Sequence, residues 1–520
     1  MKWLRNKGAI LIVIWSYLVF SVFHLLRSGY REGQSEEYVP VTGIILVGTF
    51  LFYPIGGWLA DSHLGRHAVI HYSMWIMWIA VTLATFSEVL PHLSTVFEAY
   101  AHRSVWVFGV FCVIMAVGLG GFQSNIIQFG IDQLTDASVT EITSFITWYT
   151  LTFYVSGITL QYASNCISSD EQNTTRYVKV FVVAVCLTLA LCSDFLLQHW
   201  LVREHKKVNS LRLIVKVVKY TIRYRKVSLQ HRYPVSNKLL SRLDVAKRTF
   251  GGPFTSQQVE DVKSFVKILA IASVCTAVGS GIAPVEYASE KFEHRLQNWH
   301  QNDGLTACFT KLSMDYSDYL FAISLVLLYE FIIHPLFYRC LPNVSIKSKF
   351  LFGIVIFLFR IIALLGLETA VYREHSFNNS TNCIFADINY TDIKSMVNID
   401  LRWLLIPGLI YGLSSILFIH SGIEFIWAQT PYFMTGLVIG MAFAFLGLNT
   451  IFQSAAASPF LFIKHIPWEH IPPSCGIWFF LLQGVFVLVI LMVAIVMFKK
   501  YKRRNRNDEM LDSYASYSVN

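Results

Sequence analysis

The sequence predicts an all-α membrane protein whose twelve transmembrane helices form two six-helix bundles. The first observation behind this prediction is the composition. Apolar residues make up 54% of the 520 residues and charged residues only 14%, whereas an ordinary soluble domain carries about 25% charged residues. Mean hydropathy is +0.50. A soluble core of this size could not hide so much apolar surface, so the natural solvent of this chain is the bilayer.

The second observation is the length of the apolar runs. A spanning helix needs about 20 mostly apolar residues. The chain has twelve such runs, near residues 8–28, 39–60, 67–90, 104–131, 143–164, 177–201, 264–286, 317–338, 349–371, 403–429, 432–454 and 475–498. The first run could instead be a cleaved signal peptide. Its length and the lack of a small-residue cleavage site favour a retained helix.

The third observation is where the positive charges lie. Lysine and arginine favour cytosolic loops. The N-terminal segment contains Lys2, Arg5 and Lys7, residues 499–506 contain six Lys or Arg, and the connection 202–263 contains fifteen against four Asp or Glu. Twelve spans place all three segments on one side of the membrane. The sequence therefore predicts that both termini are cytosolic.

Glycosylation sequons give an independent indication of this topology. Asn173 follows predicted span 5, and Asn378, Asn379 and Asn389 follow span 9. Both loops are external under the predicted topology, so we expect glycosylation at these four asparagines. That expectation places the protein on the secretory route, in either the plasma membrane or an endosomal or lysosomal membrane.

The basic connection divides the chain into four parts. They are the N-terminal bundle 1–201, a cytosolic linker 202–263, the C-terminal bundle 264–498 and a cytosolic tail 499–520. Residues 211–224 alternate apolar and basic side chains at near-helical spacing. This pattern predicts an amphipathic helix along the inner leaflet, with its cations near anionic lipid; a plain soluble linker is the alternative. Two six-helix bundles around a midplane cavity are a standard transporter plan.

The hinge between spans 2 and 3 places opposite charges between two apolar segments. Residues 53–70 read YPIGGWLADSHLGRHAVI, with Asp61 and Arg66 five residues apart. Gly56 and Gly57 allow helices to approach closely. A carboxylate facing a helix N-terminus and a cation facing a C-terminus would hold the bundles together while the inner gate is shut. We therefore predict that Asp61 and Arg66 form a cytosolic gate.

Four stretches together resemble the proton-coupled oligopeptide transporter family of the major facilitator superfamily. GGWLADSHLGR resembles that family's version of the superfamily's cytoplasmic signature, and residues 118–133 resemble its fourth-helix motif. Residues 241–265 resemble its entry into helix 7, and EFIWAQTP, which begins at Glu424, resembles its helix-10 motif. The four stretches occur in the family's order. The resemblance implies the superfamily fold and secondary transport.

The chain departs from the family at the residues implied to couple protons to substrate. The family's helix-1 motif Glu-x-x-Glu-Arg corresponds here to Trp15, Leu18 and Val19, and its helix-4 lysine corresponds to Gln123. The usual acidic residue of helix 7 is absent as well. A buried lysine without its partner would be costly, so the neutral Gln123 suits an apolar first helix. The family's familiar proton route is thus expected to be missing.

Charged residues inside the hydrocarbon are expensive, so those that remain are candidates for function. Glu424 is the foremost candidate, and His420, Glu424 and Trp427 share one helical face. The resemblance implies that Glu424 binds the amino terminus of a peptide. One carboxylate could then exchange a proton for substrate. The alternative to substrate binding is that Glu424 pairs with a side chain of a neighbouring helix and only stabilises the fold.

Four further residues are candidates for substrate or proton binding. Glu330 in span 8 is equally compatible with a structural role. Arg360 in span 9 could grip a substrate carboxylate, although a pair with an acid such as Glu330 is the favoured interpretation. Tyr149, like Gln123, could line the cavity, but an aromatic there is more often packing. We predict no enzyme activity, cofactor or metal site, since no P-loop, zinc spacing or nucleophile elbow occurs.

These features predict a secondary active transporter that moves small peptides or amino-acid-like substrates by alternating access, driven by protons. Its expected partners are the substrate, protons and the lipid bilayer, with no nucleic acid. Two alternatives follow from the missing coupling charges. One is a sensor or accessory protein that binds substrate without moving it, and the other is an uncoupled facilitator.

Overall fold

The computed structural model describes residues 3–32, 50–93, 104–134, 137–167, 172–202, 209–224, 241–293, 296–297, 317–333, 345–374, 397–461 and 473–501. These residues are almost entirely helical, which confirms the predicted fold class. Helix lies at each of the twelve predicted positions. Seven of the described helical stretches are long and apolar enough to cross a bilayer, namely Lys7–His24, Val110–Asp132, Val180–Trp200, Ile346–Val371, Arg402–Gln429, Tyr432–Asn449 and Ile477–Lys500.

The N-terminal half begins with a short 3-10 turn and continues through long helices. Its elements are η1 (Trp3–Arg5), α1 (Lys7–Glu32), a helix over 50–59 that continues into the π-helical turn η2 (Ala60–Leu64), α3 (Arg66–Leu93), α5 (Ser104–Asp132), α6 (Val139–Ile167), α7 (Gln172–Leu197) and η3 (Gln198–Trp200). α3 packs on α5 and α7, and α1 packs on α6 and α7.

The C-terminal half has the same kind of construction. Its elements are α10 (Ser256–Glu293), α12 (Ser317–Leu328), the π-turn η6 (Tyr329–Ile333), α14 (Ile346–Glu374), η7 (Leu401–Leu404), α15 (Leu405–Ser415), the π-turn η8 (Ile416–His420), α16 (Ser421–Gln429), η9 (Tyr432–Met434), α17 (Thr435–Leu461) and α18 (Pro473–Lys500). α10 packs on α17, α14 packs on α18 and α15, and α12 packs on α15.

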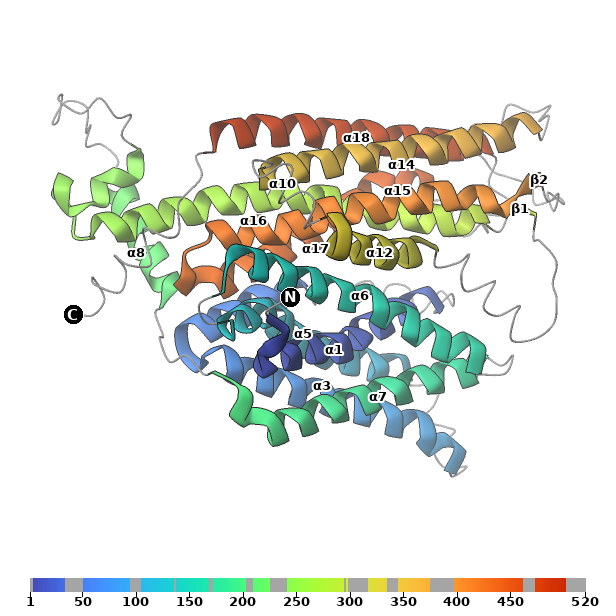
Figure 1. The fold of residues 1–520 in the computed structure, drawn as a ribbon, viewed down its shortest axis with the longest axis horizontal. Helices are drawn as coiled ribbons and strands as arrows, with labels where there is room; N and C mark the ends of the chain where they lie inside the picture. Colours follow the sequence, from blue (N-terminus) through green and yellow to red (C-terminus); the bar gives the residue numbers. More distant parts are fainter. Residues whose placement is uncertain are drawn as a thin grey trace.

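The two halves lie side by side as separate helical bundles (Figure 1). Each has its own apolar core: one centred on α1, α3, α5, α6 and α7, the other on α10, α14 and α18. Contacts between the halves run chiefly through two pairs, α6 with α12 and α5 with α17. A small cluster that includes Leu151 and Val326 joins α6 to α12. Any residue that senses motion between the halves must lie along these contacts.

The linker contains the helix that the sequence predicts, α8 (Ser210–Arg223). The Asn209 side chain caps it by accepting a 3.0 Å hydrogen bond from the Arg212 amide. Its buried residues Ile214 and Val217 join an apolar cluster that includes Val259 of α10. The turns η4 (Arg242–Ala246) and η5 (Arg248–Phe250) follow. One face of α8 therefore packs on the protein, and its contact with the leaflet stays a prediction.

Two short strands are the only described elements that the all-helical prediction does not include. β1 (Leu296–Gln297) and β2 (Val397–Asp400) pair in parallel, with Leu296 opposite Val397. They follow α10 and precede η7, at the end of the molecule opposite α8 (Figure 1). Each strand is too short to show a hydrophobic alternation that the sequence alone would reveal.

Candidate functional site

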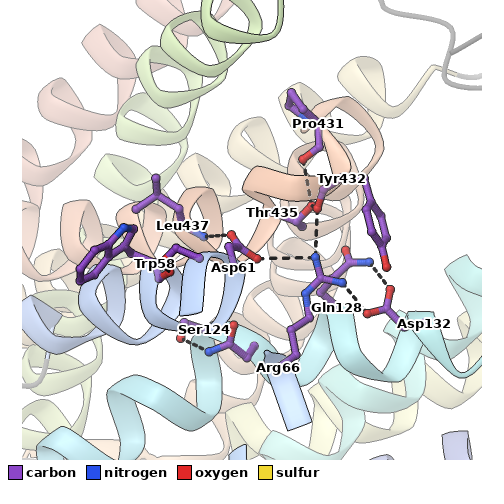
Figure 2. A network of polar contacts seen from close by, with 12 residues as sticks. Trp58, Asp61, Arg66, Ser124, Gln128, Asp132, Pro431, Tyr432, Thr435 and Leu437 are labelled. Carbon is purple, nitrogen blue, oxygen red and sulfur yellow. Dashed lines mark hydrogen bonds and ion pairs between the residues drawn. The ribbon is translucent and has the colours of Figure 1, made fainter. Parts of the chain in front are cut away.

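Asp61 lies in the π-turn η2, at the predicted cytosolic end of the second helix. The turn ends at Gly65, whose φ of 88° lies in the left-handed region that favours glycine. Asp61 is 6% exposed, and its Oδ2 accepts a 3.0 Å hydrogen bond from the Leu437 amide in the first turn of α17. The helix dipole favours a carboxylate at this position. Asp61 of the N half thus binds the start of a C-half helix (Figure 2).

Arg66, the first residue of α3, connects the same two halves. Its Nη1 donates to Asp132 Oδ2 at 2.5 Å, and its Nη2 donates to the backbone oxygen of Tyr432 at 3.0 Å. Nη2 also lies 3.6 Å from Asp61 Oδ1. The guanidinium carbon sits 4.8 Å from the centre of the Tyr432 ring. Figure 2 shows Arg66 between the two acids and the segment that leads into α17.

Burial and neighbouring charges determine the protonation of Asp61 and Arg66, the two residues of the predicted gate. Burial raises the pKa of Asp61 to about 6, although Arg66 and the Leu437 amide act in the opposite direction. For Arg66, burial alone would lower the pKa, but Asp132 and Asp61 raise it above its usual range. Arg66 therefore stays charged, whereas Asp61 titrates close to neutral pH.

Glycines let the two halves touch at this end through their backbones. A Cβ atom on Gly57 would lie 2.0 Å from the Gly436 backbone oxygen, and one on Gly440 would lie 2.3 Å from the Tyr53 backbone oxygen. Only glycine tolerates approaches this close. The second helix and α17 are therefore in backbone contact, and the predicted cytosolic side of the interface between the bundles is shut.

Glu424 lies in α16, at the boundary between the bundles. It is 6% exposed, and its Oε1 accepts a 3.0 Å hydrogen bond from the Thr143 hydroxyl of α6. Its Oε2 is buried and makes no hydrogen bond to any residue that the structure describes. The N half therefore binds this C-half carboxylate through one of its two oxygens.

Glu330 repeats this arrangement one residue further along α6. It is 7% exposed and lies in the π-turn η6. Its Oε1 accepts a hydrogen bond from the Ser144 hydroxyl, and Ser144 in turn accepts a 3.0 Å hydrogen bond from the Trp3 indole. Glu330 Oε2 has no hydrogen-bond partner among the described residues. Adjacent hydroxyls on one turn of α6 thus bind both carboxylates.

The three π-turns of the described chain coincide with predicted site residues. η2 contains Asp61, η6 contains Glu330 and η8 contains His420. π-Turns are rare, and they occur frequently at functional sites. The extra residue of each turn shifts the side chains that follow around the helix axis. The α-helical spacing assumed for His420 and Glu424 is therefore only approximate.

Aromatic and basic side chains surround the two carboxylates. The Tyr329 phenol interacts electrostatically with both Glu424 and Glu330, and it accepts a 3.3 Å hydrogen bond from Lys349. The His420 ring lies 5.8 Å from the Tyr329 ring, centre to centre. Trp427 is 7% exposed and packs into the apolar core of the N half. His420, Glu424 and Trp427 thus all lie at or near the interface between the bundles.

Gln123 and Tyr149 lie inside the N half. Gln123 is 4% exposed and accepts a 2.5 Å hydrogen bond from the Tyr53 hydroxyl. Tyr149 is 3% exposed, and its ring centre lies 5.4 Å from that of Phe20. The neutral Gln123 therefore finds a neutral partner on the neighbouring second helix. In this conformation Tyr149 is a packing residue.

The first helix fills with apolar packing the positions where the family resemblance implies charges. Trp15 and Val19 are fully buried and Leu18 is 8% exposed. The Trp15 indole donates a 2.8 Å hydrogen bond to Ser193 of α7. These side chains belong to the N-half core, so the helix offers no ionisable group at these positions.

Arg360 pairs with an acid, as the favoured interpretation expects, but the acid is Asp318 and not Glu330. Arg360 is fully buried, and its Nη2 lies 2.5 Å from Asp318 Oδ2 at the start of α12. Its guanidinium carbon lies 4.2 Å from the centre of the Tyr411 ring. Its pairing with an acid is thus realised with a different residue. Asp318 precedes the apolar part of span 8. Its position in the sequence therefore did not indicate that its side chain reaches into the bundle.

Several predicted residues lie outside the described structure. Asn378, Asn379 and Asn389 fall there. Asn173 lies in the first turn of α7 rather than in a loop. Within the described residues, no group of three His, Cys, Asp or Glu side chains could hold a metal ion.

Sequence reasoning missed the α6 hydroxyls that bind the two acids. Thr143, Thr147 and Thr150 recur at helical spacing and are all buried. This stripe is visible in the sequence, but threonines in apolar helices usually donate to the carbonyl one turn back, and the hydroxyls of Thr143, Thr147 and Thr150 all lie within 3.0 Å of that carbonyl oxygen here. The stripe alone therefore could not indicate which hydroxyl reaches a partner across the interface.

Comparisons with known proteins agree with the fold and the motifs. No protein-family model matches the chain. The chain is 30% identical over 163 residues to Protein NRT1/PTR FAMILY 5.11 of Arabidopsis thaliana, covering 31% of this chain and 29% of that protein. It is 20% identical over 515 residues to solute carrier family 15 member 3 of Rattus norvegicus, covering 87% and 83%.

The chain spans between 26% and 50% of the length of the first relative and of four other matches, so most of these likenesses are partial. Among solved structures, an auto-inhibited POT family peptide transporter superposes with a TM-score of 0.63 at 15% identity, over 96% of this chain and 98% of the other. A likeness at that identity shows the fold.

Proposed function

We propose that this chain, a divergent member of the proton-coupled oligopeptide transporter family with the major facilitator fold, is a secondary active transporter. Its substrates are small peptides or amino-acid-like molecules, and it moves them by alternating access coupled to protons. The chain is an integral, multi-pass membrane protein. We place its termini in the cytosol and the protein in the plasma membrane or an endosomal or lysosomal membrane.

The observation that carries this proposal is the hydrogen bond between Glu424 and Thr143. It joins a buried carboxylate of the C half to the N half, at the surface where the halves must separate. A carboxylate at such a surface changes its surroundings whenever the bundles rock. It can therefore bind a proton or an ammonium group in one conformation and release it in another.

The described conformation fits one stage of this cycle. The gate of Asp61 and Arg66 is closed against the start of α17, so access from the predicted cytosolic side is blocked. Opening this side would separate Thr143 from Glu424 and Ser144 from Glu330. Both acids would then face water and could release a proton or a substrate ammonium inward.

Uptake into reconstituted vesicles tests the proposal. We expect a labelled dipeptide or its C-terminal amide to accumulate when the outside is acidified at fixed inside pH, and Glu424→Gln to abolish or uncouple this uptake. Glu260→Gln is the control, because its side chain is 48% exposed in the linker region. Unchanged acid-driven uptake by Glu424→Gln would remove Glu424 from the mechanism. Equilibration without accumulation would favour a facilitator, and saturable binding without flux a sensor.

A further inference from the structure

The charges of the candidate site are unbalanced across the interface between the bundles. The C half presents Glu330 and Glu424, two carboxylates that are more than nine-tenths buried. The described N half meets them with the hydroxyls of Thr143 and Ser144. Hydroxyls can donate hydrogen bonds to a carboxylate, but they carry no charge to neutralise it.

Each of these carboxylates has one oxygen without a partner. Oε1 of each acid accepts a hydrogen bond from α6, whereas Oε2 of each is buried and makes no hydrogen bond to a described residue. An unsatisfied buried carboxylate oxygen is costly. Two such oxygens, on acids that consecutive residues of α6 bind, are suitable acceptors for a group with several N–H donors and a positive charge.

The described protein supplies no such group to this pair. Arg360 is bound to Asp318, and Lys349 donates to the Tyr329 phenol. No ion pair joins Glu330 or Glu424 to a lysine, arginine or histidine within the described residues. His420 is the nearest titratable neighbour along the chain, and its ring packs against Tyr329. The positive charge must therefore come from a proton or from a ligand.

The surrounding rings suit an organic cation. Tyr329 is 6% exposed and Trp427 is 7% exposed, and both lie on the segments that carry the two acids. Electron-rich ring faces attract ammonium groups, most strongly where water is excluded. The Tyr329 phenol interacts with both acids, so an aromatic ring stands beside the two acceptor oxygens, which suits an alkylammonium group.

The opposite end of a zwitterionic substrate would meet neutral side chains at the N-half positions where the family resemblance implies charges. A substrate carboxylate needs a cation, but the N-half positions in question hold Trp15, Leu18, Val19 and Gln123, all buried and neutral. Gln123 is itself occupied by Tyr53. Extended across the interface, a free peptide would place its carboxylate against neutral packing.

We infer that this site selects organic ammonium ions that lack a carboxylate, such as amines and the amides or esters of amino acids and small peptides, over zwitterionic peptides. This inference rests on the proposed function, because it assumes that Glu424 and Glu330 lie at the substrate site. It narrows the substrate class from peptides in general to cationic ones.

Binding to the purified full-length protein with three matched compounds tests the inference. They are alanyl-alanine amide, a cation; alanyl-alanine, a zwitterion; and N-acetyl-alanyl-alanine amide, which is neutral. We expect the cation to bind at least about tenfold more tightly than either of the others, the ratio that one charged hydrogen bond provides. Glu330→Gln and Glu424→Gln should each weaken the affinity for the cation at least about tenfold.

Controls and contrary outcomes are well defined. Glu260→Gln should bind all three compounds as the wild type does. Equal or tighter binding of the zwitterion overturns the inference, and so does failure of all three compounds to bind. If the zwitterion accumulates in vesicles under a proton gradient, transport stands and cation selectivity fails. If the amide binds but never crosses the membrane, cation selectivity stands and transport fails.

Discussion

The two halves of the molecule distribute their buried polar groups differently. In the described N half, buried polar side chains within the bundle are mostly neutral, such as Gln123, and the buried acids Asp61 and Asp194 stand at the predicted cytosolic ends of helices. In the described C half, buried charges lie within the spanning helices. They are Glu330, Arg360, Glu368 and Glu424.

This difference separates the tasks of the two halves. The N half contributes hydrogen-bond donors and the charged gate, whereas the C half contributes the carboxylates that those donors bind. When the halves separate, it is the acids of the C half that lose partners. A charged group can respond to such a change by taking up a proton or an ammonium ion, but a hydroxyl cannot. We therefore expect coupling to reside in the C half.

Removing the N-half cation should produce the largest effect. Arg66→Met leaves Asp61 and Asp132 buried without their counter-charge, which should cost about 3–5 kcal/mol of the closed conformation. The distance between spin labels on the exposed residues Leu64 and Ser345 should then lengthen. Adding Asp61→Asn and Asp132→Asn should restore part of the closed population, and the exposed Arg212→Met should change nothing. An unaltered distance in Arg66→Met would contradict the gate.

Introducing a charge into the neutral half tests the comparison directly. Gln123→Lys would place an ammonium beside the Tyr53 hydroxyl, with no described acid in hydrogen-bond contact. We expect a loss of about 3 kcal/mol in stability, at the lower end for a buried unpaired charge because lysine can lose its proton. Gln123→Met, which removes only the hydrogen bond, should cost about 1–3 kcal/mol. Thermal unfolding midpoints that rank the two in the reverse order would refute the neutrality argument.

Removing the donors that meet the C-half acids should have an intermediate effect. Thr143→Val and Ser144→Ala each delete a hydrogen bond to a carboxylate, with an expected cost of about 1.5–3 kcal/mol to the closed conformation. Thr147→Val is the matched control, because the Thr147 hydroxyl donates to the Thr143 backbone oxygen of its own helix. The same pair of spin labels reports the result. Equal shifts in all three variants would mean that the hydroxyls act only within α6.

The sequence predicted the fold more fully than the site, for a physical reason. Helix positions follow from runs of apolar residues, which are local, and each of the twelve runs has helix in the described structure. The contacts that Asp61 and Arg66 make between the halves could also be anticipated, because these two residues and the glycines stand together in one short hinge. Their partners in η9 and at the start of α17 are backbone groups, and no residue type in the sequence indicates which backbone groups these are.

The site was predictable only where a residue type is unusual in hydrocarbon. Glu330 and Glu424 were recognisable as buried carboxylates for that reason. Thr143 and Ser144 could not be recognised as their partners, since hydroxyl side chains are common in apolar helices. Arg360 shows the same limit, because its partner Asp318 is 42 residues away in sequence. Which side chains meet across an interface depends on packing, and packing between distant segments leaves no local pattern.

The smallest predicted effect concerns the pH response of the gate. Asp61 faces Arg66, Asp132 and the start of α17, and burial in the closed gate raises its pKa to about 6, well above the ordinary range of an aspartate. The closed gate therefore binds the Asp61 proton more tightly than an open, hydrated gate would. Acidification from about pH 7 to about pH 5 should then favour closure, by about 1 kcal/mol.

The spin-label distance between Leu64 and Ser345, followed over this pH range, measures the effect. Asp61→Asn should remove the pH dependence, whereas Glu330→Gln and Glu424→Gln should leave the contribution of Asp61 in place. Closure that weakens on acidification would show that ionised Asp61, held by Arg66 and the Leu437 amide, is the form that shuts the gate. Protonation of Asp61 would then open the gate instead of shutting it. In either case Asp61 is a proton-sensitive group of the N half, and the task we assign to the C half is the coupling of protons to substrate.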